Sequence, residues 1–185
     1  MPKNTRGMEN LLQMLREAGL LHETDLDVLR WWSKLRSFIR DRNLVTNDNL
    51  DDIGIYGEFL TLEYERSRLQ TIESIRWVSR WDGDHYGYDI QSFENQNMQE
   101  RRFIEVKSSI NSVTEANIYL TFNEYRQLTL LGGSYFLYLW PDIYSQSNSN
   151  PIIVSGNKVV MVMKDINPNI ISWDGAVIIP FEELI

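Results

Sequence analysis

Two charged residues, Glu105 and Lys107, stand two positions apart in the stretch RFIEVKSS, which otherwise has the apolar and β-branched character of a core strand. Because side chains alternate between the two faces of a strand, Glu105 and Lys107 share one face, while Ile104 and Val106 share the other. Such a pair can serve chemistry on a phosphate, or it can be an ordinary ion pair on a solvated face. The rest of the sequence bears on this choice.

Two further acidic residues accompany this pair. Asp89 lies in YGYDIQSF, residues 86–93, a stretch that is otherwise aromatic and apolar, and Glu58 follows Gly57 near the start of an expected helix. A hairpin can bring Asp89 and Glu105 side by side, about 5 Å apart. Two carboxylates that close repel each other unless one is protonated or a cation lies between them. Their oxygen ligands favour Mg²⁺, with Mn²⁺ as the alternative.

These residue types together suit the hydrolysis of a phosphodiester. A divalent cation held by Asp89 and Glu105 binds a phosphate oxygen and lowers the pKa of a bound water. The Lys107 ammonium can orient or help to deprotonate that water, and it can offset charge in the transition state. Glu58 can reach the same metal, a second metal or a metal-bound water. We therefore predict catalytic roles for Glu58, Asp89, Glu105 and Lys107, with Asp89, Glu105 and Glu58 as metal ligands.

The elements that would position these residues follow from periodicity and turn signals. A helix is expected from Gly57 to about Gln70, then three strands joined by short links, then a helix capped by Thr121 or Asn123 and ended by two glycines. Short links predict an antiparallel meander, and the helix before the next strand predicts a crossover, which gives a mixed α/β sheet flanked by helices. The expected strands are 72–80, 86–93, RFIEVKSS, 117–122 and 134–140, with short strands or turns at 158–166 and 176–181.

The first part of the chain has a different pattern. Residues 1–50 are expected to form a helical extension, residues 51–185 the main domain, and the polar segment 43–54 the boundary between them. Apolar residues recur at helical spacing in the extension, and a stripe of this length is expected to be buried against the core or a second chain. A protein partner or a homodimer is therefore expected there. The stripe comprises Leu11, Leu15, Leu29, Trp32, Leu35 and Ile39.

Composition excludes several classes of protein. The chain has no cysteine, so disulfides, thiolate metal sites and thiol catalysis are excluded, and two separated histidines make a histidine zinc site improbable. The net charge of −8 argues against nucleic-acid binding by bulk electrostatics but leaves room for a local cleft. No apolar run reaches transmembrane length and the first residues are too polar for a signal peptide, which favours a cytoplasmic protein without membrane contact.

At this point the sequence resembles a known family. Asp89 followed by Glu105-Val106-Lys107, with Glu58 upstream, looks like the PD-(D/E)xK nuclease superfamily, whose core has the order αβββαβ. The segments YGEFLTLEYERSRL, GDHYGYDIQS, RFIEVKSS and LTFNEY resemble more specifically the C-terminal domain of the plant protein NO VEIN, over roughly residues 54–140. Tyr88 departs from the superfamily's pattern, because it stands where the superfamily's name has proline.

The resemblance implies a restriction-endonuclease-like core and a Mg²⁺-dependent endonuclease that acts on DNA, in restriction or phage defence. RNA is a weaker substrate alternative, since the phosphodiester chemistry is shared. The competing hypothesis is a catalytically inactive module with a nuclease fold that binds nucleic acid or a partner protein. A decayed nuclease usually loses a metal ligand or the lysine, and this sequence keeps all of them.

Several neighbouring residues have two interpretations each. Glu65 shares the helical face of Glu58 and is either a supporting acid or a surface residue. His85 precedes Asp89 in a loop and is expected to be incidental. Asn123 and Glu124 are expected to cap a helix rather than contact substrate. The two serines after Lys107, Ser108 and Ser109, can contact substrate or support the site.

Overall fold

The computed structural model describes residues 50–71, 74–82, 84–145, 150–166 and 175–185, which belong to a compact unit that runs from Asp48 to Ile185. The helical extension expected over residues 1–50 lies outside the described residues, apart from Leu50, and so does its apolar stripe. The proposed burial of that stripe therefore stays a prediction.

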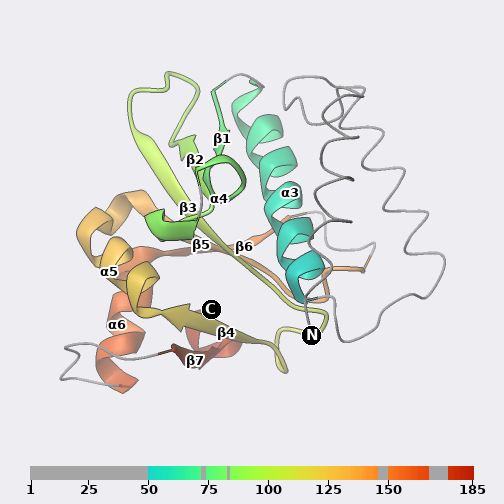
Figure 1. Ribbon diagram of the computed structural model, residues 1–185, viewed down its shortest axis with the longest axis vertical. Helices are drawn as coiled ribbons and strands as arrows, with labels where there is room; N and C mark the ends of the chain where they lie inside the picture. Colours follow the sequence, from blue (N-terminus) through green and yellow to red (C-terminus); the bar gives the residue numbers. More distant parts are fainter. Residues whose placement is uncertain (1–49, 72–73, 83, 146–149, 167–174) are drawn as a thin grey trace, which may run out of the picture. The chain divides into compact units, whose positions relative to one another are not determined.

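Helices and strands alternate along the described chain in the expected order (Figure 1). The long helix α3 comes first, a group of strands follows, and helix α5 precedes the next long strand. The elements are α3 (Leu50–Leu69), β1 (Arg76–Trp77), α4 (Val78–Trp81), η1 (Asp84–Tyr86), β2 (Ile90–Phe93), β3 (Arg101–Ser108), β4 (Asn117–Thr121), α5 (Phe122–Leu131), η2 (Gly132–Ser134), β5 (Tyr135–Trp140), β6 (Ile152–Ser155), α6 (Gly156–Ile166), β7 (Ala176–Pro180) and α7 (Phe181–Leu184).

The strands of the described residues form a mixed sheet in the order β1-β2-β3-β5-β6. The strands β1, β2 and β3 are an antiparallel meander, whereas β5 runs parallel to β3 and antiparallel to β6. A parallel neighbour requires a crossover connection, and the segment containing β4 and α5 supplies it. The predicted meander, crossover and mixed sheet are therefore confirmed, with β4 and β7 forming a separate two-stranded sheet.

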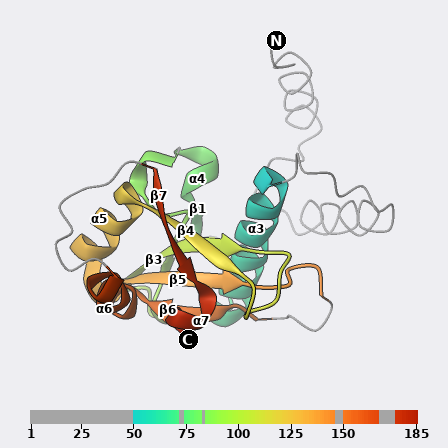
Figure 2. The same cartoon turned by 90° about the horizontal axis from the view of Figure 1, so that it is seen from below.

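Each face of the main sheet has its own apolar core. Helix α3 covers one face (Figure 1), and its Leu62 is buried with Ile90, Ile104 and Tyr138 of the sheet. The other face is covered by α5, α6 and the β4–β7 ribbon, which crosses the sheet (Figure 2). Strand β5 is buried on both sides because its residues alternate between the two cores, and this explains its almost continuous apolar sequence.

The structure corrects four expectations about individual elements. Helix α3 begins at Leu50 and not near Gly57, so it includes the end of the polar segment 43–54 expected as a boundary. The run 158–166 is not a set of strands or turns but lies in helix α6, whose Val159 and Met163 are buried four residues apart, at helical spacing. The expected strand 72–80 is reduced to β1, since the chain turns into α4 at Val78. Strand β2 begins at Ile90 rather than at residue 86, because η1 occupies residues 84–86.

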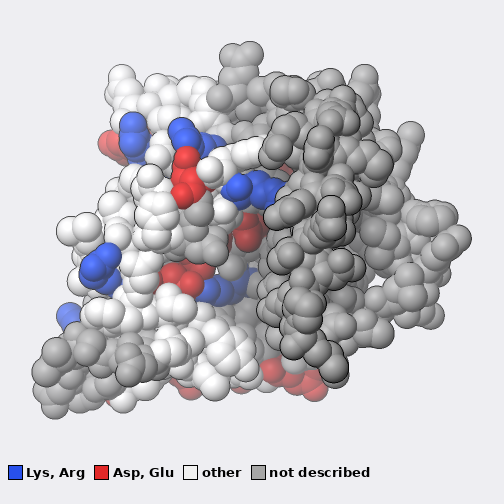
Figure 3. Space-filling model, viewed as in Figure 1, with Lys and Arg blue, Asp and Glu red and all other residues white. Residues whose placement is uncertain are grey.

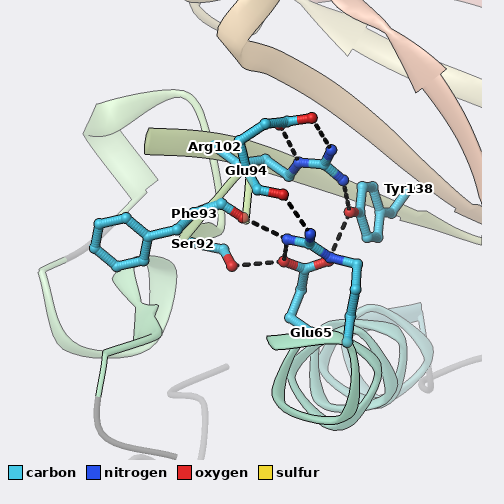
Figure 4. Close-up of polar contacts among 7 residues, drawn as sticks. Glu65, Ser92, Phe93, Glu94, Arg102 and Tyr138 are labelled. Atoms are coloured by element: carbon cyan, nitrogen blue, oxygen red, sulfur yellow. Dashed lines mark hydrogen bonds and ion pairs between the residues drawn. The ribbon is translucent and has the colours of Figure 1, made fainter. Parts of the chain in front are cut away.

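A buried polar network fastens α3 to the sheet (Figure 4). At its centre lies Glu65, whose side chain is fully buried. One carboxylate oxygen accepts hydrogen bonds from the Tyr138 hydroxyl at 2.7 Å and from Arg68 Nε at 2.8 Å. The other accepts from the Ser92 hydroxyl at 2.5 Å and from Arg68 Nη2 at 2.6 Å. A buried carboxylate is costly unless it is paired in this way.

The network continues into the β2–β3 hairpin. Arg102 of β3 forms a bidentate pair with Glu94, at 2.9 and 2.7 Å, and donates to the Tyr138 hydroxyl at 2.6 Å. This pairing holds the pKa of Glu94 below its ordinary value. Arg68 also donates to the backbone carbonyls of Phe93 and Glu94. One end of α3 is thereby joined to β2, β3 and β5, which sets the position of the helix that carries Glu58.

Candidate active site

The helix α3 comes very close to the end of β3, and a glycine makes this possible. A Cβ atom added at Gly57 would lie 1.7 Å from the Ser108 hydroxyl oxygen and 3.3 Å from Val106 Cγ1. Only glycine fits such an approach of backbone to side chain. The adjacent residue, Glu58, therefore lies on the turn of α3 that approaches the end of β3.

Glu58 is held by the short helix α4. One of its carboxylate oxygens accepts hydrogen bonds from the indole N–H of Trp77 and from the hydroxyl of Ser79. The backbone N–H groups of Val78 and Ser79 donate at 2.7 and 3.1 Å to the carbonyl oxygen of Asp89. The start of α4 thus contacts both Glu58 and the backbone of Asp89, which joins two residues that are far apart in the sequence.

Asp89 occupies the point at which β2 stops pairing with β3. The register Ile90↔Ile104 is the last pair of the ladder. One position further, the Asp89 carboxylate accepts the backbone N–H of Val106 at 2.7 Å. The backbone N–H of Asp89 still donates to the carbonyl of Ile104 at 2.9 Å, and the side chain satisfies the next N–H group of β3, which lies beyond the ladder. This also directs the carboxylate towards the part of β3 that lies between Glu105 and Lys107.

Lys107 and Glu105 extend from the same face of β3, as predicted, and form an ion pair of 2.7 Å between Nζ and Oε1. Their side chains are only 15% and 6% exposed, so this is not a solvated surface pair. The Lys107 ammonium has a second partner, Glu124 of α5, at 3.1 Å. A lysine between two carboxylates, well shielded from water, is a stronger electrostatic arrangement than an exposed pair.

The start of α5 supports the site from the side opposite to α3. Thr121 is its N-cap and forms a capping box with Glu124, in which each side chain bonds the backbone N–H of the other residue. The Asn123 amide donates to the carbonyl of His85 at 3.2 Å, so η1 is tied to α5. The buried Tyr135 hydroxyl donates to the carbonyl of Gly87 at 2.7 Å, which ties the same segment to β5.

The acidic groups of the site disfavour one another's charged forms. Burial and then the charge of Glu58 raise the pKa of Asp89 to about 8, against the opposing effects of the Val106 N–H group and of Lys107. Burial, followed by the charge of Asp89, likewise raises the pKa of Glu105 well above its ordinary value. Burial alone would lower the pKa of Lys107, but Glu105 and Glu124 outweigh it and raise that pKa. The lysine is therefore an ammonium at neutral pH.

The chemistry of these donors fits a hard divalent cation. Across the part of the chain that the structure describes, no three acidic or histidine side chains form a ready-made metal cage. Mg²⁺ rarely uses such a cage, because it keeps several waters and binds through one or two carboxylates together with substrate phosphates. The half-buried Asp89 and the buried Glu105, each with a raised pKa, offer two carboxylates whose repulsion a cation would relieve.

The surface of the described residues shows the same mixture of charges. In Figure 3, acidic and basic side chains lie next to each other below α4, in the region that Figure 1 shows between α3, α5 and β4. Both signs of charge therefore reach this face over a short distance.

The structure agrees with some of the residue roles predicted from the sequence and not with others. The shared face of Glu105 and Lys107 is as predicted. Of the two predicted caps, Thr121 is the N-cap, whereas the Asn123 amide donates to the carbonyl of His85. Glu124 combines the predicted capping role with a contact to Lys107. Glu65 lies in the buried network and not on the surface. The side chain of His85 is exposed.

The anchors of Glu58 were not among the predicted site residues. Trp77 and Ser79 lie in a segment whose pattern is that of a strand, and nothing in that pattern signals a turn into α4. The apolar character of Trp77 indicates a core residue, whereas its indole N–H group binds Glu58. The serines Ser108 and Ser109 support the site through backbone and side-chain packing: the buried Ser108 hydroxyl lies against Gly57, and Ser109 bonds the chain after β5.

Comparison with known proteins identifies one family. The family described as "Protein NO VEIN, C-terminal" matches residues 57–154, which is slightly more than half of the chain and contains all four predicted catalytic residues. Comparison with curated proteins and with solved structures finds no match. Among the described residues there is no helix of the length and apolar character that a membrane span requires.

Proposed function

Because the chain belongs to the family of the NO VEIN C-terminal domain, we propose that it is a Mg²⁺-dependent endonuclease that hydrolyses phosphodiester bonds of DNA. The observation that carries this proposal is the shielded Lys107 ammonium, bound to Glu105 on the strand face beside Asp89. This is the arrangement expected of the PD-(D/E)xK superfamily, which the sequence resembles. The biological setting that the resemblance implies is restriction or phage defence. RNA is the weaker alternative to DNA as the substrate.

Two carboxylates of this chain, Asp89 and Glu105, would hold the cation. When bound, a divalent cation neutralises charge on a phosphodiester and makes a water molecule easier to deprotonate. The Asp89 carboxylate is aimed by the hydrogen bond from Val106 N–H, so it needs little reorganisation to bind. Glu58, anchored by Trp77, contributes a third negative charge next to Asp89.

Lys107 supplies a fixed positive charge next to the reacting phosphate. Hydrolysis joins a water oxygen to phosphorus and breaks the ester P–O bond on the opposite side. The attacking water gives up one proton to solvent, and the departing oxygen takes one up from solvent. Negative charge grows on the phosphate oxygens during this step. An ammonium held in a shielded position stabilises that charge. Since Glu105 and Glu124 keep Lys107 protonated, we assign to it this electrostatic role and not that of a general base.

One observation favours the competing hypothesis of an inactive module. Without a cation, Lys107 already satisfies Glu105, and the described residues contain no cage of three metal ligands. A protein that only binds nucleic acid or a partner could keep this arrangement as a structural ion pair. Such a protein would bind without cleaving, whichever cation is present.

The test is a cleavage assay with the full chain. Duplex DNA, single-stranded DNA and RNA are each incubated with Mg²⁺, with Mn²⁺ or with EDTA, beside the Asp89→Asn protein. We expect cation-dependent cleavage of DNA that the Asp89→Asn protein lacks. Binding of nucleic acid with no cleavage under any of these conditions would favour the inactive module, and cleavage that persists in EDTA would contradict the metal-dependent mechanism.

A further inference from the structure

The Lys107 ammonium is shared between two carboxylates from different elements. Its Nζ lies 2.7 Å from Glu105 Oε1 on β3 and 3.1 Å from Glu124 Oε1 on α5. We propose that Glu124 is a positioning residue, which retains the Lys107 ammonium at the phosphate site when Glu105 is engaged by the cation. This inference rests on the proposed function, and it adds a residue outside the predicted set of Glu58, Asp89, Glu105 and Lys107.

Glu105 faces two competing demands. In the metal-free protein its Oε1 atom accepts from Lys107. In the proposed enzyme the same carboxylate binds a divalent cation, whose positive charge repels the ammonium next to it. If Glu105 were the sole partner of Lys107, cation binding would leave a largely buried ammonium without a partner, which is costly. A second carboxylate at 3.1 Å removes that cost.

Glu124 is suited to this task because its carboxylate is held in place. Its Oε2 atom accepts the backbone N–H of Thr121 at 2.9 Å, which leaves Oε1 directed at Lys107. The Thr121 hydroxyl accepts the backbone N–H of Glu124 at 3.3 Å, so the first turn of α5 is locked by the capping box. The neighbouring Asn123 fixes that turn against His85. A carboxylate held by a helix start can keep the ammonium in one position.

The substitution Glu124→Gln separates the two roles of this residue. Glutamine is accepted in a capping box, so the fold of α5 should be kept. The glutamine amide has one acceptor oxygen, however, and it cannot serve both the Thr121 N–H group and Lys107. With the oxygen at the cap, the amide NH₂ group faces the ammonium. Lys107 is then left with Glu105 alone and competes with the cation for it.

The experiment is a double-mutant cycle on metal binding, measured by calorimetry with Mn²⁺ alone on the full chain. The proteins are the wild type, Glu124→Gln, Lys107→Met and the double variant. We expect Glu124→Gln to weaken Mn²⁺ binding by about 10-fold or more, in the range found for residues that support metal ligands. In the Lys107→Met background the same substitution should have little effect, because the competing ammonium is absent.

A matched control removes a carboxylate that does not contact Lys107. Glu115 is exposed on the loop before β4, and Glu115→Gln should leave both stability and Mn²⁺ affinity nearly unchanged. In a cleavage assay Glu124→Gln should lower kcat by about 10- to 100-fold with an unaltered KM for DNA. Restoration of a carboxylate on a shorter side chain, Glu124→Asp, should recover part of this loss.

The outcomes separate this inference from the proposed function. If Glu124→Gln weakens Mn²⁺ binding equally in both backgrounds, its effect is a general charge effect and the positioning role is wrong. If the wild type cleaves and Glu124→Gln cleaves at the same rate, the positioning role is also wrong while the nuclease proposal stands. If the wild type binds Mn²⁺ and shows the coupling but never cleaves, the nuclease proposal fails alone. A wild type that binds no Mn²⁺ overturns both.

Discussion

The Asp89 carboxylate accepts the backbone N–H of Val106 at 2.7 Å, one position beyond the last β2–β3 pair. This half-buried side chain extends the pairing of β2 with β3 by one hydrogen bond and, in doing so, lies near Glu105. The same residue is both a structural cap for β3 and the proposed ligand of a cation. The surroundings oppose the second role, because burial and the charge of Glu58 favour the protonated acid, whereas a cation requires the carboxylate, which the Val106 N–H group also favours.

This conflict predicts a pH dependence for the metal-free protein. The pKa of Asp89 is raised to about 8 in the fold and is about 3.9 in an unfolded chain. Between these values the folded state keeps a proton that the unfolded state releases, so the free energy of unfolding falls as the pH rises. Asp89→Asn keeps the acceptor for Val106 and removes the titration. It should be more stable than the wild type at pH 8, by up to about 5 kcal/mol, and nearly equal to it at pH 4.

Urea denaturation in EDTA at pH 4, 6 and 8 measures this difference. The exposed Glu100 on the β2–β3 loop provides the control, since Glu100→Gln also removes one acid. If the stabilities of the wild type and Asp89→Asn changed in parallel between pH 4 and pH 8, the raised pKa of Asp89 would be contradicted.

Lys107 is predicted to matter for the reaction and little for the fold. Lys107→Met keeps most of the apolar stem and removes the ammonium, and it should lower the cleavage rate by about 10²- to 10³-fold, the usual effect of losing one well-placed electrostatic contact. Mn²⁺ binding should be retained or strengthened, because a neighbouring positive charge has gone. Single-turnover cleavage and calorimetry provide the two measurements. A Lys107→Met protein that cuts as fast as the wild type would show that the ion pair with Glu105 is only structural.

The network around Glu65 is predicted to dominate the stability of the described fold. Glu65→Ala leaves Arg68 without its carboxylate partner and also removes the acceptor of Ser92 and Tyr138. Breaking a buried pair in this way should cost about 3–5 kcal/mol. The exposed Glu63 lies on the same helix, and Glu63→Ala should cost less than about 1 kcal/mol. Chemical denaturation compares the two, and similar losses in both variants would show that the network adds no specific stability.

The close approach of α3 to β3 gives a prediction with an internal control. Gly57→Ala would place a Cβ atom 1.7 Å from the Ser108 hydroxyl oxygen, whereas Gly54→Ala on the same helix meets no atom within 4 Å. Alanine is the better helix former, so Gly54→Ala should stabilise by about 0.5–1 kcal/mol. Gly57→Ala should instead destabilise by about 1–3 kcal/mol, because the packed neighbours must move.

Thermal denaturation of both glycine variants shows the sign of each effect. Adding Ser108→Ala to Gly57→Ala removes the closest clash but leaves the Ser108 Cβ atom at 3.0 Å, so it should recover part of the stability. If Gly57→Ala proved as stabilising as Gly54→Ala, α3 would not lie as close to β3 as the structure places it.

The sequence alone determined the features that depend on neighbouring residues. The period of two in β3 is enough to place Glu105 and Lys107 on one face, and the pattern Thr121 to Glu124 is enough to start α5. The order of helices and strands follows from the same local signals and from the rule that a parallel neighbour needs a crossover. Local signals were insufficient where two structures share one pattern, as in α6, whose apolar run is compatible with a strand or a helix.

Only the tertiary structure decided which distant side chains meet. Glu65 bonds Ser92 and Tyr138, which lie 27 and 73 positions further along the chain. Glu58 depends on Trp77 and Ser79, and these contacts exist only because the chain turns into α4 against the carbonyl of Asp89. Hydrogen bonds and ion pairs act over a few ångströms, so they depend on how the elements pack and not on their spacing in the sequence. The same short range explains why the contact between Glu124 and Lys107 becomes visible only when α5 lies beside β3.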